Sequence, residues 1–431
     1  MELEELLRAE APQVLGALVR RFSRFAEAED ATQEALLVAS RRWPVDGVPD
    51  DPRSWLIRVA YRRMVDLLRS EQADRRREQE AAQAAAHAQV QAVRTAGADG
   101  DPAGSAPWGA DQDDSLLLLF LCCHPALSPP SQVALTLRAV GGLTTAEIAR
   151  AYGAAERSMS TRISRAKQTL KETGARFSAP TDAGDRRRAA GERAQDERIA
   201  AVMHVLYLIF NEGYTATGGD QLARADLTQE AIRLTRMLHR LLPGDAEVTG
   251  LLALMLLTSS RDATRADEDN HLIQLEDQDR SRWDQAAIAD GVALIEAAWT
   301  QNEVGPYQLQ AAIAAVHAQA PSAGATDWPQ IAALYLWLER LAPTAPIRLS
   351  RVVAVSKAFG PHRALALLDD LDKNQQLTQD PLLQHRATAV RAHLLESTGN
   401  PTEARAAYLT AAALATNQVE RHYLLTRAHN L

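Results

Sequence analysis

Long apolar runs are missing from this sequence of 431 residues. The longest, such as Leu116–Cys123 and Gly250–Leu257, fall well short of the roughly 18 residues that a membrane-spanning helix needs. The first residues, Met1-Glu-Leu-Glu-Glu, are acidic, whereas a secretory signal begins with basic and then apolar residues. We therefore expect a cytoplasmic protein that makes no contact with a membrane.

Cysteines are scarce, and the common catalytic motifs are missing. The two cysteines, Cys122 and Cys123, are adjacent, and only His124 beside them could serve as a further metal ligand. We expect both to be small core residues rather than a disulfide or a metal site. The sequence contains no GxxxxGK[ST], HExxH, GxSxG or glycine-rich dinucleotide motif. It therefore predicts no catalytic residues, no metal and no cofactor, and we expect that the protein is not an enzyme.

The charge is unevenly distributed along the chain. The net charge is −8, but residues 130–193 contain 12 Lys and Arg against 6 Asp and Glu. A local basic patch on an acidic protein favours specific over nonspecific DNA binding.

Apolar residues at three- and four-residue spacing, with glycine and proline mostly between the periodic stretches, predict an all-α fold. No alternation typical of a strand is convincing. The chain divides into five segments. They are two helical blocks at 1–70 and 115–176, a linker at 71–114 between them, a connector at 177–195, and a long helical block at 196–431.

A helix-turn-helix motif is predicted in the second helical block. Thr144 or Thr145 can cap a first helix, Gly153 can take the turn, and a second helix follows over 156–171. One stripe of that helix is apolar, at Met159, Ile163, Ala166 and Leu170. Its other face is basic and rich in hydroxyl groups, at Arg157, Ser160, Thr161, Arg162, Arg165 and Lys167. Arginine can recognise guanine, and hydroxyl groups and lysine can bind phosphates, so this face is a DNA-binding candidate. A charged, solvated helix in a bundle would show the same pattern.

This block resembles region 4 of sigma factors, which binds the −35 promoter element. The matching residues are Leu127-Ser-Pro129, Ala134–Arg138, Gly142-Leu143, Glu147-Ile-Ala149, Gly153 and the stretch from Arg162 to Leu170. The first block resembles sigma region 2 in Glu29-Asp-Ala-Thr-Gln-Glu-Ala35 and in Trp55-Leu56, Val59-Ala60, Asp66 and Arg69. Order and spacing are similar to those of an extracytoplasmic-function (ECF) sigma factor of RNA polymerase, over about 175 residues. The resemblance implies a factor that binds core polymerase, through its β′ and β subunits, and promoter DNA.

The resemblance also implies site residues in the first block. In the family, an acidic helix of region 2 contacts the β′ subunit, and here Glu29, Asp30, Gln33 and Glu34 would supply that face. The −10 element is bound by the next helix and the loop before it, here about Pro44–Arg53. Basic and aromatic side chains hold single-stranded bases, so we expect DNA contacts from Arg58, Tyr61 and Arg62. Trp55 is expected in the core.

The last block is similar to tetratricopeptide-type helical hairpins. Ala404, Tyr408 and Ala411 match the hairpin core, and weaker copies lie near Ala231 and Ala364. Further phrases resemble an ECF subgroup with such an extension, and that resemblance implies a role for the extension in adjusting activity. They include Leu206–Tyr214, Leu275–Asp284 and Gly305–His317.

Two alternatives remain open at this stage. Polar residues of the extension could line a pocket for a ligand or a partner protein, or form an ionic network between helices. They are Asn211, Glu212, Glu276, Asp277, Asp279, Arg280, Arg282 and Asp284. A pocket that gathers Glu212, Asp277, Asp279 and Arg282 would favour an enzyme. The other alternative is a helix-turn-helix regulator that binds duplex DNA without polymerase.

Overall fold

The structure is a computed structural model that describes residues 3–87, 115–152, 154–173, 185–216, 218, 221–267, 269–300, 304–374 and 381–431. Every regular element in these ranges is helical, apart from one isolated bridge between Ala266 and Leu272. The prediction of an all-α fold is therefore confirmed. Within the described ranges, no helix is both long and apolar enough to cross a membrane. The chain forms two compact units, of residues 1–149 with 155–202 and of residues 150–154 with 203–431.

Three helices open the first unit and pack on one another: α1 (Leu3–Phe22), α2 (Phe25–Asp46) and α3 (Pro52–His87). Their apolar stripes are buried, at Val14, Leu18, Ala28, Ala35, Leu56 and Met64. Gly47, at φ +86°, ends α2, and the Asp51 carboxylate accepts a hydrogen bond from the Ser54 N–H at the start of α3.

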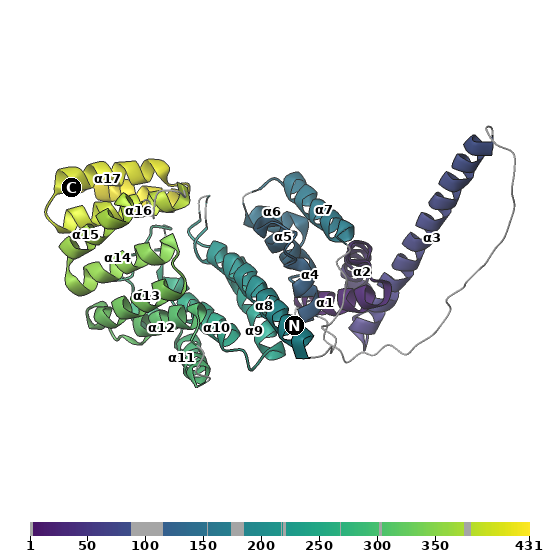
Figure 1. Ribbon diagram of the computed structural model, residues 1–431, viewed down its shortest axis with the longest axis horizontal. Helices are drawn as coiled ribbons and strands as arrows, with labels where there is room; N and C mark the ends of the chain where they lie inside the picture. Colours follow the sequence, from purple (N-terminus) through teal and green to yellow (C-terminus); the bar gives the residue numbers. More distant parts are fainter. Residues whose placement is uncertain are drawn as a thin grey trace. The chain divides into compact units, whose positions relative to one another are not determined.

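Helix α3 is longer than the sequence pattern indicates, and in Figure 1 its second half continues past α1 and α2. Residues 71–87, predicted as part of the linker, extend this helix. They are rich in Arg, Glu, Gln and Ala, which are strong helix formers, and their charge had suggested a linker instead. The rest of the predicted linker, 88–114, lies outside the described residues.

Four shorter helices follow in the first unit: α4 (Ser115–Cys122), α5 (Pro129–Ala139), α6 (Thr145–Ala151) and α7 (Glu156–Glu172). Helix α5 packs on α4 and α7, while α1 contacts α4 and α5, and α2 contacts α7. Cys122 and Cys123 are 0% and 3% exposed, as predicted for core residues. Burial raises the pKa of both thiols, that of Cys123 to about 12.

Helix α8 (Asp185–Tyr214) begins inside the predicted connector 177–195, of which residues 177–184 are not described. Its start is rich in Arg, Ala and Glu, and these residues offset the single Gly191. The boundary between the two units falls within this helix, after Val202. The connector is therefore shorter than its glycine and proline content suggests.

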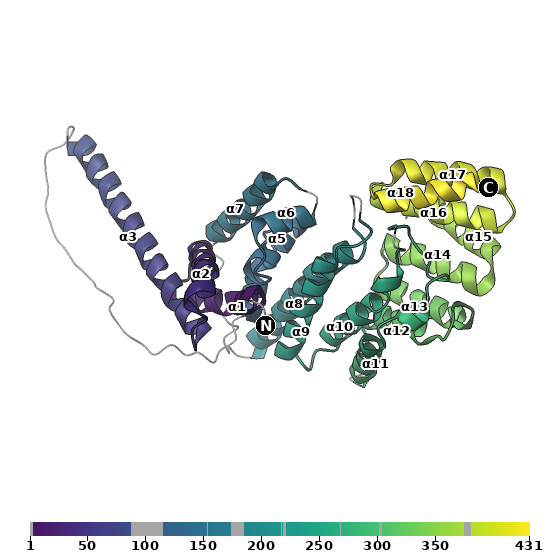
Figure 2. The same cartoon turned by 180° about the vertical axis from the view of Figure 1, so that it is seen from behind.

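The second unit is a succession of helices in which each packs on the next (Figure 2). They are α9 (Ala225–Leu241), α10 (Ala246–Ser259), α11 (Gln285–Trp299), α12 (Pro306–Gln319), α13 (Trp328–Leu341), α14 (Ala345–Phe359), α15 (Pro361–Lys373), α16 (Pro381–Ser397), α17 (Pro401–Leu414) and α18 (Gln418–His429). Three short 3₁₀ turns lie between them, at Asp262–Thr264, Arg280–Arg282 and Ala323–Ala325.

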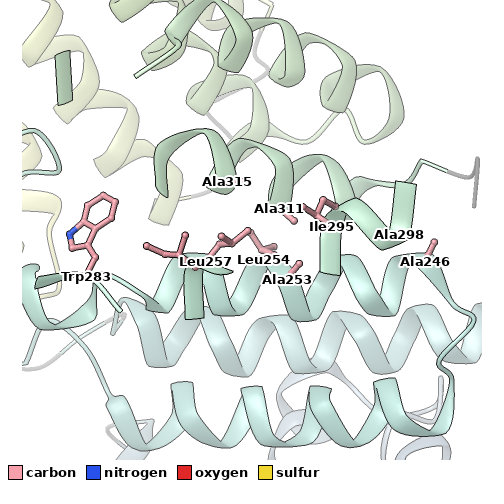
Figure 3. Close-up of a cluster of buried hydrophobic side chains, with 10 residues drawn as sticks. Ala246, Ala253, Leu254, Leu257, Trp283, Ile295, Ala298, Ala311 and Ala315 are labelled. Atoms are coloured by element: carbon pink, nitrogen blue, oxygen red, sulfur yellow. The ribbon is translucent and has the colours of Figure 1, made fainter. Parts of the chain in front are cut away.

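Helix α10 lies at the centre of one core cluster, shown in Figure 3. Leu254 and Leu257 on this helix join Ile295 of α11, Ala311 of α12 and the buried Trp283. Close packing depends on small residues here, because a Cβ on Gly291 of α11 would lie 2.6 Å from the Leu257 side chain.

A half-buried carboxylate also joins α10 to α12. The Glu247 side chain accepts hydrogen bonds from the backbone N–H groups of Tyr307 and Gln308, at 3.0 and 3.1 Å. These are free donors of the first turn of α12, so Glu247 caps that helix from another part of the chain.

Candidate functional site

The helix-turn-helix is present, with α6 and α7 as its two helices. Thr144 caps α6, since its hydroxyl accepts from the Glu147 N–H at 3.2 Å while the Glu147 carboxylate accepts from the Thr144 N–H at 2.6 Å. The predicted turn residue, Gly153, lies outside the described residues. The predicted apolar stripe of α7 is confirmed, because Met159, Ile163, Ala166 and Leu170 are its buried residues.

The opposite face of α7 presents five of its six predicted DNA-binding residues to solvent. They are Arg157, Ser160, Thr161, Arg162 and Arg165. No carboxylate is paired with Arg157, Arg162 or Arg165 among the described residues, so these three cations are free to meet phosphates or bases. The Thr161 hydroxyl donates to the Arg157 carbonyl at 2.9 Å within the helix.

Lys167, the sixth residue, is turned toward α2. Its ammonium group forms ion pairs with Glu29 and, at 2.7 Å, with Asp30. Burial lowers the pKa of this lysine, but the two carboxylates outweigh burial, and the net pKa is raised. Lys167 is therefore held as a cation in a contact within the protein.

Glu29 is at the centre of that contact. Its side chain is only 1% exposed, and its carboxylate also accepts a hydrogen bond from the Arg138 Nε of α5 at 3.0 Å. One buried anion is thus held between two cations, one from α5 and one from α7. A more exposed pair, Lys171 of α7 with Glu27 of α2 at 3.0 Å, lies at the same interface. We call Glu29, Arg138 and Lys167 the buried triad.

The four residues predicted to face the polymerase are therefore not equally accessible. Glu29 is enclosed by the buried triad, and Asp30 is 65% exposed but paired with Lys167. Gln33 is half-buried, while Glu34 is exposed and pairs with Arg63 of α3. Leu37, one turn after Gln33 on α2, is 51% exposed. The open part of this face is thus an acidic surface with one apolar side chain.

The residues predicted to contact the −10 element lie on α3 and differ in their exposure to solvent. Arg58 and Arg62 are exposed, whereas Tyr61 is half-buried with its ring 5.4 Å from that of Phe22. Trp55, predicted in the core, is half-buried, and its ring lies 5.4 Å from that of the buried Trp43. Helix α2 continues to Asp46, so the loop before α3 is shorter than predicted. Val45 and Val48 beside it are 83% and 51% exposed, which sequence reasoning did not single out.

In the second unit, the three residues predicted for a hairpin core are buried. Ala404 and Ala411 are 0% exposed and Tyr408 is 2% exposed, and the Tyr408 hydroxyl donates to Glu396 of α16 at 2.6 Å. Ala231 and Ala364, which mark the weaker copies, are also fully buried.

Several polar side chains of the phrase at 275–284 cap helices or bind backbone carbonyls, and one forms an ion pair. The Asp279 and Asp284 carboxylates cap Arg280–Arg282 and α11, and Arg280 donates to the carbonyls of His317 and Ala320. Glu276 pairs with Lys357 of α14 at 2.6 Å. A cavity of about 550 Å³ in this unit is lined by Glu276 and Arg280, but not by Glu212, Asp277, Asp279 or Arg282.

Arg138 is the residue that sequence reasoning missed. It lies in the phrase Ala134–Arg138 that resembles sigma region 4, but nothing in the spacing links it to Glu29, 109 positions earlier. Such a long-range pair has no signal in one sequence.

Comparisons with known proteins agree with this geometry. Residues 6–74 match the family model of sigma-70 region 2, and residues 117–170 match that of sigma-70 region 4. Residues 198–299 match a family of unknown function, DUF6596. The chain is 41% identical over 420 residues to an uncharacterized protein of Rhizobium meliloti (strain 1021), a match covering 97% of this chain and 93% of the relative. No solved structure is detectably similar.

Proposed function

We propose that this chain, which belongs to the ECF-like sigma-70 family and carries a C-terminal extension, binds core RNA polymerase and positions it at promoters. Its regions 2 and 4 give it a sigma factor role in promoter-specific transcription. The finer proposal is that α7 reads the −35 element, α3 contacts the −10 element, and the extension adjusts activity. Its site of action would be the cytoplasm, and the polymerase would perform all of the chemistry.

The exposed face of α7 is the observation that carries this proposal. Five predicted DNA contacts are open to solvent, and four apolar residues anchor the helix from behind. Such a helix can enter the major groove while its stripe stays packed. Arg162 and Arg165 are the residues most able to give base specificity, because a bidentate arginine is worth about 1–3 kcal/mol of discrimination.

The surface around the start of α3 supports a contact with single-stranded DNA. Arg58 and Arg62 supply exposed cations, and Val45 and Val48 supply exposed apolar surface beside the loop. Sites for single strands combine such charges with surfaces against which bases can stack. Tyr61 is half-buried, with its ring 5.4 Å from that of Phe22, so only part of it is open to a base.

The polymerase contact on α2 requires a change within the first unit. Glu29 cannot reach a partner protein while the buried triad encloses it, and Asp30 is bound to Lys167. We propose that α5 and α7 move away from α2 when the polymerase binds. Lys167 would then become available to DNA as Glu29 and Asp30 become available to the β′ subunit.

Transcription in vitro tests the proposal. Full-length protein would be combined with core polymerase on the promoter of its own operon, and a double variant, Arg162→Ala with Arg165→Ala, would be compared with it. We expect specific transcripts from the wild type and a strong loss in the variant. Arg240→Ala, which removes an exposed arginine from α9, is the matched control and should leave transcription unchanged.

The rival function is a regulator that binds duplex DNA without polymerase. Its support would be the same exposed face of α7, so only binding can separate the two. Tight binding of the protein alone to duplex promoter DNA, with no affinity for core polymerase, would establish the regulator instead.

A further inference from the structure

A cavity of about 550 Å³ lies in the second unit. Its walls come from the end of α8 and the residue after it, from residues 261–280 and 323–328, and from α14, α16, α17 and α18. This volume is in the range of sites that bind small molecules.

The charge of the cavity wall is strongly unbalanced. Arg261, Arg265, Arg280 and Lys357 line it, and Glu276 is the carboxylate that lines it with them. Glu276 is already paired with Lys357 at 2.6 Å. Three guanidinium groups therefore remain without a carboxylate among the lining residues. The nearest carboxylate of the described residues to Arg265 is Asp262, at 4.0 Å.

These arginines are held in place by neutral groups rather than by carboxylates. Arg265 is 8% exposed and donates to the Tyr214 carbonyl and to the Thr215 hydroxyl. Arg280 donates to the carbonyls of His317 and Ala320, at 2.6 and 2.8 Å. Neutral partners fix the position of a cation but do not balance its charge, and the Asp262 carboxylate, at 4.0 Å from Arg265, does so only for part of this set.

Two further observations concern the surroundings of Arg280. The Arg280 Nε is buried and has no hydrogen-bond partner among the described residues. His317, beside Arg280, has its pKa lowered to about 4 by burial and by the positive charges of Arg261 and Arg280. An anion in the cavity would give the Arg280 Nε the hydrogen-bond acceptor that it lacks.

The remaining wall suits an apolar or aromatic body. The Tyr214 ring lies under the Arg265 guanidinium at 3.6 Å and within 5.5 Å of that of Arg261. Trp328, Tyr408 and Tyr423 also line the cavity, together with leucine and valine side chains. Aromatic rings offer large contact areas to a flat ligand.

We propose that this cavity, the arginine pocket (Arg261, Arg265 and Arg280), binds a small organic anion. The carboxylate or phosphate group of the ligand lies at the arginines, and its apolar or aromatic body lies against the tyrosine and tryptophan rings. The proposal concerns ligand binding alone, so its test does not depend on polymerase or promoter.

Calorimetric titration of the full-length protein tests it, with phenyl phosphate and benzoate as anionic probes. Benzyl alcohol provides a neutral probe of similar size, and inorganic phosphate provides the charge without the ring. We expect both aromatic anions to bind and to raise the melting temperature, with the alcohol and the inorganic ion much weaker. No binding by either aromatic anion, or equal binding by the neutral probe or by inorganic phosphate, would overturn the proposal.

Arg261→Gln is the decisive variant, because the Arg261 guanidinium makes no ion pair among the described residues and its loss should not unfold the unit. A charge-assisted hydrogen bond contributes about 1.5–3 kcal/mol, so the anions should bind at least about tenfold more weakly. Arg363→Gln on α15, where the arginine lies near the Phe359 ring and outside the cavity, is the matched control. Equal affinity in Arg261→Gln and Arg363→Gln would show that the anions bind elsewhere and would refute the assignment.

Discussion

The buried triad allows a quantitative prediction, and Arg138→Met is the change that tests it. Arg138 belongs to neither the predicted DNA-binding set nor the predicted polymerase-binding set, so the variant leaves both surfaces intact. It removes one of two cations from a carboxylate that is 1% exposed. The loss of a partner from a buried ion pair costs about 3–5 kcal/mol, but Glu29 keeps Lys167. We therefore expect the contact of α2 with α5 and α7 to weaken by about 2 kcal/mol, close to the value of one charged hydrogen bond.

That free energy corresponds to about a 30-fold change in the equilibrium between closed and separated regions. Arg138 also donates to the Leu143 carbonyl at 3.1 Å, but this bond lies within region 4 and is lost equally in both states. Hydrogen exchange on the full-length protein should show faster exchange in 25–46 and 156–172. The affinity for core polymerase should rise, because less free energy is needed to expose Glu29.

Lys171→Met is the control for this prediction. It removes a cation from the same interface, but the Lys171 side chain is 57% exposed, and exposed pairs contribute under about 1 kcal/mol. The two variants should therefore differ clearly in exchange and in polymerase affinity. Indistinguishable behaviour would refute the view that burial of Glu29 holds the two regions together.

Three further outcomes are expected. The thiols of Cys122 and Cys123 should not react with a thiol reagent at pH 8 in the native protein, since burial raises their pKa, and should react after unfolding in denaturant. Gly291→Ala should destabilise the second unit by about 1–3 kcal/mol in calorimetric unfolding, whereas Gly244→Ala, with open space around its Cβ, should be near neutral. Burial raises the pKa of Asp262 to about 6 against the opposing effect of the two neighbouring arginines, so stability should fall as pH rises from about 4 to 6. With a side chain 38% exposed, solvent screening reduces this effect to about 1 kcal/mol, and Asp262→Asn should remove the slope.

Local patterns in the sequence predicted the parts of the fold that depend on neighbours along the chain. The stripe Met159–Leu170 and the hairpin residues around Tyr408 follow from helical periodicity, and both are buried as expected. Helix ends were less predictable. Residues 71–87 and 185–195 are charged enough to suggest linkers, yet Arg, Glu and Ala also favour helices, and composition alone does not separate the two.

For the predicted polymerase contact on α2, the sequence indicated the types of residue but not which of them are exposed to solvent. The resemblance to sigma region 2 implied that Glu29 and Asp30 belong to an acidic face of α2 that contacts the polymerase. The structure instead shows Glu29 bound to cations from α5 and α7, more than 100 positions away in the chain. Pairing at such separations depends on tertiary packing, which one sequence does not encode in any local pattern.

The position of Lys167 links the two proposed activities of the first unit. This lysine is one of six predicted DNA contacts, and in the structure it neutralises two of four predicted polymerase contacts. A single separation of α7 from α2 would therefore free a cation for DNA and two anions for the polymerase together. If the closed arrangement is favoured by about 2 kcal/mol, roughly 3% of free molecules are open, and the apparent affinity for the polymerase falls about 30-fold. Once the polymerase is bound to α2, Lys167 is no longer paired with Glu29 and Asp30. It can then bind promoter DNA without breaking an ion pair. On this argument, polymerase and DNA favour the same open state, and each should strengthen the binding of the other.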